Sequence, residues 1–313
     1  MRTFPLTLAI FAIVCLSAPI SRAAGAAPAA LKTFLEHEGY GGSQLQRRLG
    51  NHLFVNTVMN GRRTALMVDT GCPSTLIDRG SAGKIGLNIR ESEYSVTNVV
   101  GLHRRFGFSS VATLVMGNCT FKDVPVLVAD QKELLTYARP YLDGLFGAHE
   151  MAKFGMIIDC TRQMIYVNPR GPSAAASQKL AQYLSGRGFT RVPMRFNPDH
   201  HLVIDAAING HPVQLTVDTG AATTLVSAPV AANDGASLSP RFSYHGQGIG
   251  RVNQLTLGDL VVNNAEVEIE NVTKQVGGGL LGEEYLSWNF GIVDLGGMKL
   301  YLRPPEANAP KKR

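Results

Sequence analysis

Residue patterns that mark several common enzyme classes are missing from this chain of 313 residues, which holds only 8 histidines and 4 cysteines. The histidines form no His-Glu-x-x-His pattern, and we expect Asp199-His200-His201 to be a solvated turn rather than a metal site. No Gly-x-Ser-x-Gly elbow is present, and Gly277-Gly278-Gly279 lacks the Lys-Ser/Thr of a phosphate loop. The sequence therefore predicts no metal and no cofactor.

Charge is also sparse. Charged residues make up 17% of the chain, and the formal net charge of +6 comes partly from the tail Lys311–Arg313. Because there is no basic helix and no basic-aromatic alternation, we expect no nucleic-acid partner. Hydrophobic residues make up 45%, which is typical of a globular protein with sizeable cores, and 33 glycines and 16 prolines favour strands and turns.

The first 23 residues are typical of an export signal. Arg2 is followed by the apolar segment 6–16 and by the small-x-small cleavage pattern Ser21-Arg22-Ala23. The apolar segment is short for a bilayer span, although an uncleaved anchor is the alternative. We therefore expect a periplasmic or secreted protein with no stable membrane insertion after cleavage. Cleavage would remove Cys15 and leave three cysteines, which can form at most one disulfide: Cys72, Cys119 and Cys160.

One stretch occurs twice, at an offset of 149 residues. Thr64–Gly71 and Val213–Gly220 are each a short apolar run that ends in Asp-Thr-Gly. Such a run predicts a buried strand that stops in a tight turn, so Asp69 and Asp218 lie where burial makes ionisation unfavourable. Other matching segments occur in the same order in both halves: His52-Leu53 and His201-Leu202, Asn60-Gly61 and Asn209-Gly210, Thr75-Leu76 and Thr224-Leu225, Gly144–Gly147 and Gly279–Gly282, Phe154–Asp159 and Phe290–Asp294. This register indicates an internal duplication.

The duplication predicts an all-β fold of two similar lobes, related by an approximate two-fold axis, with a site at the seam. The expected segments are a signal peptide (1–23), an N-terminal arm (24–51), a first lobe (52–169), a linker with a short helix (170–199), a second lobe (200–304) and a basic tail (305–313).

A two-fold axis would bring Asp69 and Asp218 face to face. Two carboxylates at such a seam do not both ionise easily, so they would share one proton. The ionised member could deprotonate a water while the protonated member donates to a carbonyl oxygen, which is acid–base hydrolysis of an amide. The alternative is a pair of ordinary strand-ending turns. The expected supporting residues are Thr70 and Thr219, which would hydrogen-bond across the seam, and Gly71 and Gly220, which would let backbone approach the carboxylates.

The motif Val-Asp-Thr-Gly-x-x-x-Thr-Leu, present in both halves, resembles that of the aspartic peptidase superfamily of retroviral-type and pepsin-like enzymes. The resemblance covers residues 52–304 and includes a later apolar-apolar-Gly segment in each half, ending in Gly147 or Gly282. It implies retropepsin-like β-barrel lobes with a catalytic pair, Asp69 and Asp218. It also implies that the segments ending in Gly147 and Gly282 support the Asp-Thr-Gly loops.

The chain departs from the pepsin-like pattern three residues after each aspartate, where Cys72 and Ala221 replace a hydroxyl side chain. Because loss of that donor should raise the apparent pKa values of the pair, we expect activity at mildly acid to near-neutral pH. The resemblance also implies hairpin flaps that close over substrate, with ordinary turns as the alternative. The flap candidates are Gly101 and Leu102 in the first lobe, and Gly248 and Ile249 in the second.

We therefore predict an aspartic endopeptidase that acts as a monomer on a peptide or protein substrate. One alternative is a catalytically silent peptide-binding or inhibitory protein with the same fold. Another is that each lobe pairs with a second chain.

Overall fold

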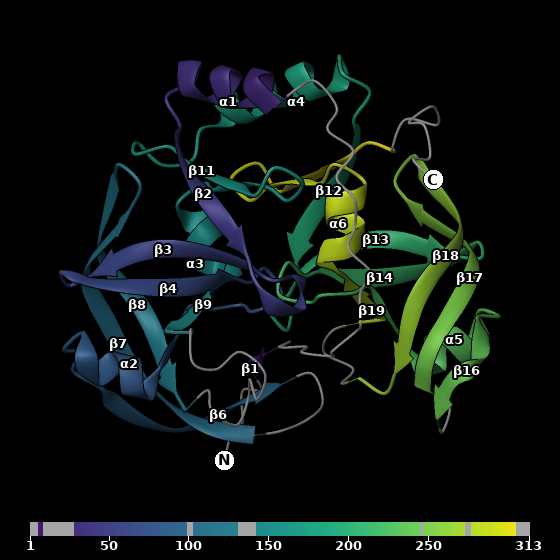
Figure 1. Cartoon of the computed structure of the whole chain (residues 1–313), viewed down its shortest axis with the longest axis horizontal. Helices are drawn as coiled ribbons and strands as arrows, with labels where there is room; N and C mark the ends of the chain where they lie inside the picture. Colours follow the sequence, from purple (N-terminus) through teal and green to yellow (C-terminus); the bar gives the residue numbers. More distant parts are fainter. Residues whose placement is uncertain are drawn as a thin grey trace.

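Two lobes built almost entirely from strands lie side by side, with a sheet between them and two helices above it (Figure 1). The computed structural model describes residues 6–8, 28–98, 103–130, 142–244, 247–272 and 277–304. The predicted all-β fold of two similar lobes is confirmed.

Each lobe is a closed barrel of six strands. The first lobe contains β3 (Leu53–Met59), β4 (Arg62–Val68), β5 (Leu76–Asp78), β7 (His103–Met116), β8 (Cys119–Ala129) and β9 (Gly144–Phe146). The second contains β13 (Leu202–Ile208), β14 (His211–Val217), β15 (Leu225–Ser227), β17 (Gln247–Leu257), β18 (Leu260–Glu270) and β19 (Gly279–Leu281). Pairing runs β3–β4–β9–β5–β8–β7 and back to β3. It runs β13–β14–β19–β15–β18–β17 and back to β13 in the second lobe.

Shorter elements complete each lobe. A hairpin strand lies beside each barrel, β6 (Arg90–Asn98) next to β7 and β16 (Ser237–Tyr244) next to β17. The strand β1 (Leu6–Leu8), which falls within the expected export signal, runs parallel to β6. The short helices are α2 (Arg79–Lys84) and α3 (Ala148–Lys153) in the first lobe, α5 (Ala228–Asn233) and α6 (Glu283–Trp288) in the second, and the 3₁₀ turn η1 (Leu49–Asn51).

Asn-Gly turns set the register of the hairpins that lead to the site. Asn60 and Gly61 have φ values of 47° and 79°, and Asn209 and Gly210 have 50° and 84°. Two successive left-handed residues are what a type I′ turn requires, and this turn matches the twist of the strands it joins. The strands that follow, β4 and β14, are therefore held in register, and each carries its last apolar residues into the barrel core.

A six-stranded antiparallel sheet joins the lobes, in the order β2–β11–β10–β20–β21–β12. Its strands are β2 (Gly41–Arg47), β10 (Ile157–Asp159), β11 (Met164–Val167), β12 (Thr190–Phe196), β20 (Ile292–Asp294) and β21 (Lys299–Leu302). At its centre Ile158 of the first lobe pairs with Val293 of the second, and both are fully buried. β2 and β12 continue into the barrels by pairing with β3 and β13. The lobes are thus fixed to one another by backbone hydrogen bonds and a shared apolar core.

The duplicated unit begins earlier in the chain than the segments from 52 and from 200 suggest. Its first helices, α1 (Pro28–His37) and α4 (Ala174–Ser185), lie side by side at the top of Figure 1 and stack Phe34 on Tyr183 at 4.2 Å between ring centroids. Phe34 and Tyr183 are separated by the same offset of 149 residues as the two Asp-Thr-Gly loops. The expected arm and the expected linker are therefore equivalent parts of the repeat, and each supplies a helix and a strand of the joining sheet.

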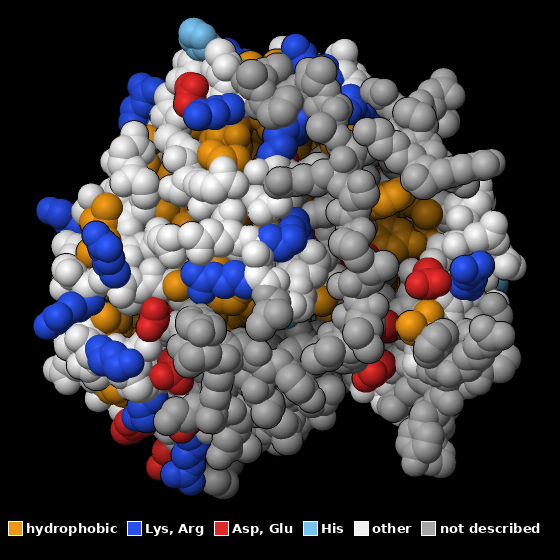
Figure 2. Space-filling model, viewed as in Figure 1, with side chains coloured by type: hydrophobic (Ala, Val, Ile, Leu, Met, Phe, Trp, Pro, Cys, Tyr) orange, Lys and Arg blue, Asp and Glu red, His pale blue; other side chains and the backbone are white. Residues whose placement is uncertain are grey.

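Charged side chains of both signs are scattered over the first lobe on the face seen in Figure 2. One exposed ion pair of the first lobe joins Arg79 to Glu91, with 2.6 Å between nitrogen and oxygen. Within the described part of the chain, no helix combines the length and the apolar character needed to cross a membrane.

Candidate active site

The two Asp-Thr-Gly loops lie at the seam, each at the end of a buried strand. Asp69 follows β4 and Asp218 follows β14, and both side chains are fully buried. The backbone N–H of Asp69 donates to the carbonyl of Phe146 at 3.1 Å, and that of Asp218 donates to Leu281 at 3.0 Å. Because Phe146 and Leu281 belong to β9 and β19, the apolar-apolar-Gly segments hold the start of each loop.

Thr70 and Thr219 bind the two loops to each other. The Thr70 hydroxyl donates to the carbonyl of Val217 at 2.7 Å and accepts from the Thr219 N–H at 3.0 Å. The Thr219 hydroxyl donates to the carbonyl of Val68 at 2.8 Å and accepts from the Thr70 N–H at 3.1 Å. These four hydrogen bonds cross the seam and obey its two-fold symmetry.

Gly71 and Gly220 bring each loop against the aspartate of the other lobe. A Cβ atom on Gly71 would lie 2.3 Å from the Asp218 carboxyl carbon, and one on Gly220 would lie 2.5 Å from that of Asp69. No side chain larger than hydrogen fits at these distances. The structure therefore brings together all six residues that the sequence predicted for the Asp69–Asp218 pair, which we call the dyad, and for its two loops.

The Oδ2 atoms of Asp69 and Asp218 are both buried and have no hydrogen-bond partner among the described residues. Burial, followed by the charge of Asp218, raises the pKa of Asp69 well above its ordinary value, and burial raises the pKa of Asp218 to about 7. Asp218 Oδ1 accepts from the N–H groups of Gly220 and Ala221 at 2.8 and 3.0 Å, whereas Asp69 Oδ1 accepts from Cys72 at 2.9 Å. The extra donor makes Asp218 the better holder of the negative charge, and Asp69 the holder of the proton.

Cys72 and Ala221 serve the pair through their backbone rather than their side chains. The Cys72 thiol is fully buried and donates to the carbonyl of Ser74 at 2.9 Å, and burial raises its pKa well above the ordinary value. A buried thiol of this kind behaves as a small apolar side chain. The described cysteines Cys72, Cys119 and Cys160 are all buried and free.

Gly147 and Gly282 lie beneath the dyad loops. A Cβ atom on Gly147 would lie 2.2 Å from the backbone of Ser74, and one on Gly282 would lie 2.3 Å from the backbone of Thr223. Their N–H groups donate to the hydroxyls of Thr75 and Thr224 at 3.1 and 3.0 Å. The supporting segments are thus tied to the end of each loop.

Two glutamates that the sequence analysis did not select, the buried Glu150 and the half-buried Glu284, complete this support. Glu150 of α3 accepts from the N–H and the hydroxyl of Thr75 at 2.6 and 2.8 Å, and Glu284 of α6 accepts from the N–H of Thr224. Burial raises the pKa of Glu150, and it raises that of Glu284 to about 7. The sequence signal that could have identified these glutamates is an acidic residue in the first helical turn after Gly147 and after Gly282.

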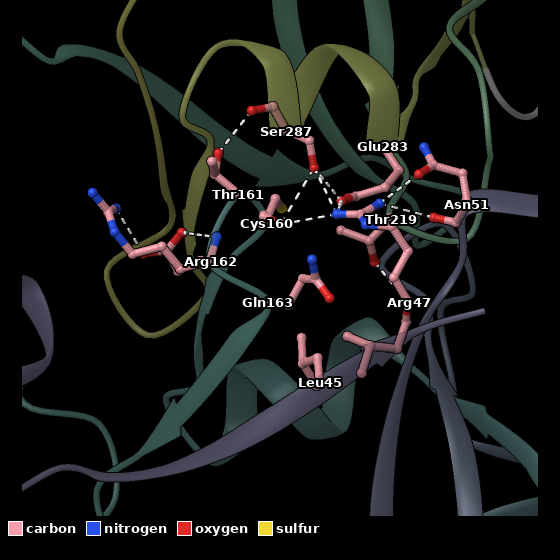
Figure 3. A network of polar contacts seen from close by, with 12 residues as sticks. Leu45, Arg47, Asn51, Cys160, Thr161, Arg162, Gln163, Thr219, Glu283 and Ser287 are labelled. Carbon is pink, nitrogen blue, oxygen red and sulfur yellow. Dashed lines mark hydrogen bonds and ion pairs between the residues drawn. The ribbon is translucent and has the colours of Figure 1, made fainter. Parts of the chain in front are cut away.

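A second unselected group ties the N-terminal strand to both lobes (Figure 3). Arg47 of β2 donates to Glu283 and Ser287 of α6, each at 2.8 Å, and to the carbonyl of Cys160 at 3.0 Å. It also binds the Asn51 side chain at 2.6 Å. Glu283 is fully buried, and burial raises its pKa to about 6 although Arg47 lowers it. Removing Arg47 would leave a buried carboxylate without its cation.

The remaining predictions have mixed outcomes. The flap candidates Gly101 and Leu102 lie outside the described residues, whereas Gly248 and Ile249 lie in β17 and pair with β18. The solvated turn predicted at Asp199-His200-His201 is wrong in part, because His201 is fully buried. In the described ranges, no three His, Cys, Asp or Glu side chains are grouped so that they could hold a metal ion.

Comparison with known proteins finds a family match in each half of the chain. Residues 55–149 match the family described as aspartyl protease, and residues 204–287 match the gag-polyprotein putative aspartyl protease family. A solved structure of a retropepsin-like aspartic protease from Rickettsia conorii is 20% identical, with a TM-score of 0.29, over 41% of this chain and 90% of that one. No curated protein sequence matches the chain.

Proposed function

Because this chain belongs to the aspartic peptidase superfamily, we propose that it is an endopeptidase that hydrolyses peptide bonds at the Asp69–Asp218 pair. The observation that carries the proposal is that two fully buried carboxyl groups, one from each lobe, lie at loops whose glycines each approach the aspartate of the other lobe. A like-charged pair in a buried site retains one proton, so an acid and a base coexist at the same pH.

The unequal number of backbone N–H donors gives the two carboxyl groups different roles. Asp218, which accepts two backbone N–H groups, carries the charge and takes a proton from a water molecule as the water oxygen bonds to the carbonyl carbon. Asp69 gives its proton to the carbonyl oxygen, and a tetrahedral diol forms. Asp218 then returns its proton to the amide nitrogen as the carbon–nitrogen bond breaks, and Asp69 recovers a proton from the diol. No covalent bond to the enzyme forms.

Cleavage of a mixed peptide library, followed by mass spectrometry, tests this proposal. Asp69→Asn and Asp218→Asn keep the shape of each side chain, and each should reduce cleavage by at least about 10³-fold, since the pair acts as a unit. The matched control is Asp205→Asn, because Asp205 is an exposed aspartate paired with Arg195 on the second lobe. Cleavage that survives both dyad substitutions would refute the proposal. Peptide binding without cleavage by the wild type would favour the silent alternative.

We further propose that the chain is exported and acts as a monomer. The apolar segment 6–16 and the pattern Ser21-Arg22-Ala23 support export. The presence of both dyad loops in one chain supports the monomer. Mass spectrometry of the mature N-terminus should show a start just after Ala23 or Ala24, and the active species should elute from a sizing column at the mass of one chain.

A further inference from the structure

Two buried histidines occupy equivalent positions in the two lobes. His201, just before β13, is fully buried, and its Nδ1 lies 3.1 Å from the carbonyl oxygen of Gly71. His52, just before β3, occupies the equivalent position in the first lobe and is 6% exposed, but its Nδ1 has no hydrogen-bond partner among the described residues. The contact across the seam is therefore made by His201.

The peptide group that His201 contacts also holds a catalytic carboxyl. The Gly71 carbonyl belongs to the same planar unit as the Cys72 N–H, which donates to Asp69 at 2.9 Å. Because the two ends of a planar peptide turn together, a donor that fixes the carbonyl also fixes the direction of the N–H.

We propose that His201 is a positioning residue that clasps the Gly71–Cys72 peptide across the seam and thereby sets the proton affinity of the dyad. His201 of the second lobe acts on Asp69 of the first. The inference rests on the proposed function, and it adds a residue that does not touch the reacting atoms. Hydrogen bonds in such a chain polarise one another, so the N–H at the carboxyl end is a stronger donor while the clasp is made.

The clasp requires a neutral His201 that donates from Nδ1, and the surroundings of His201 favour this form. Burial lowers the pKa of His201. The charged and titratable groups around His201 are Asp199, which raises its pKa, and His200 and His149, which lower it.

Two readouts test the clasp in the full-length protein. One is the pH dependence of kcat/KM with fluorescein-labelled casein, and the other is the titration of ¹³C-labelled aspartate carboxyls by NMR, assigned with Asp69→Asn. His201→Leu removes the donor and should move the dyad titration and the acid limb of the pH profile upward by on the order of 1 pH unit. His201→Asn, whose amide nitrogen occupies the place of Nδ1, should restore values near the wild type. His211→Leu, at an exposed histidine of β14, is the control.

The outcomes separate the clasp from the catalytic proposal. A folded His201→Leu with wild-type titration, or a His201→Asn that shifts as far as His201→Leu, would overturn the clasp. If His201→Leu does not fold, His201→Phe, which keeps an aromatic ring without the donor, decides, with an upward shift expected and an unchanged titration overturning the inference. If the wild type cleaves nothing while the titration of His201→Leu moves, the proposed function fails and the clasp stands.

Discussion

Replacing Thr219 by valine tests how strongly the lobes are held at the seam. Valine keeps the shape of threonine but loses the hydroxyl, so the Thr70 N–H loses its acceptor at 3.1 Å and the Val68 carbonyl loses its donor at 2.8 Å. Thr70 and Val68 are both fully buried, and water cannot replace the lost partners. Each unsatisfied group costs about 1–3 kcal/mol, so Thr219→Val should lower the free energy of unfolding by about 2–6 kcal/mol. That is a large part of the roughly 5–15 kcal/mol typical of a folded protein.

The assay is urea-induced unfolding followed by far-ultraviolet circular dichroism. The sole tryptophan, Trp288, is 60% exposed and would report poorly on the core. The matched control is the double variant Thr57→Val/Thr64→Val, in which two buried hydroxyls that bind each other at 2.7 Å are removed together. Because both partners are removed at once, this variant should lose no more than about 1 kcal/mol. A Thr219→Val variant that loses no more than the double variant would refute the reasoning.

Three further predictions concern buried groups near the dyad. His52 has a pKa of about 4 in the folded protein and 6.5 ordinarily, so the unfolded chain binds more protons than the folded protein between these pH values. Because of His52, the free energy of unfolding should fall by about 3 kcal/mol as the pH falls from 7 to 4. Urea unfolding of His52→Leu should accordingly show a decline smaller by that amount, and an equal decline in both proteins would contradict it. Glu284→Gln keeps an acceptor for the Thr224 N–H and should retain the stability of the wild type, whereas Glu284→Leu should lose about 1–3 kcal/mol. Equal losses by the two variants in urea unfolding would show that this hydrogen bond does not stabilise the fold. Cys72 should react with iodoacetamide only after unfolding, as followed by mass spectrometry, and rapid labelling of the native protein would show an accessible thiol.

The barrels and the dyad could be predicted because their determinants are local and occur twice. An apolar strand, an Asp-Thr-Gly turn and an Asn-Gly hairpin each specify a conformation from neighbouring residues alone. The repeat then implies that Asp69 and Asp218 meet at an axis. The structure adds that Asp218 has the extra backbone donor, which makes the pair unequal.

The joining sheet could not be predicted with the same ease. Leu31-x-x-Phe34-Leu35 and Leu180-x-x-Tyr183-Leu184 repeat at the same offset, but a few apolar positions on a short helix are a weak pattern. The pairing of β10 with β20 depends on contacts between distant segments, which no local preference encodes. The same holds for the buried side chains that support the loops. Glu150 and His201 are buried, and Arg47 is half-buried, because distant backbone groups supply hydrogen-bond partners for these polar side chains.

The central claim is that Asp69 and Asp218 hold one proton between them. NMR titration of ¹³C-labelled aspartate in the wild type and in Asp218→Asn tests it most directly, because the substitution removes the charge that helps to raise the pKa of Asp69. In the wild type, Asp69 should remain protonated while Asp218 ionises, and in Asp218→Asn the titration of Asp69 should move to lower pH. Two carboxyls that titrate independently near their ordinary value of 3.8, or an Asp69 titration that Asp218→Asn leaves unchanged, would contradict the account.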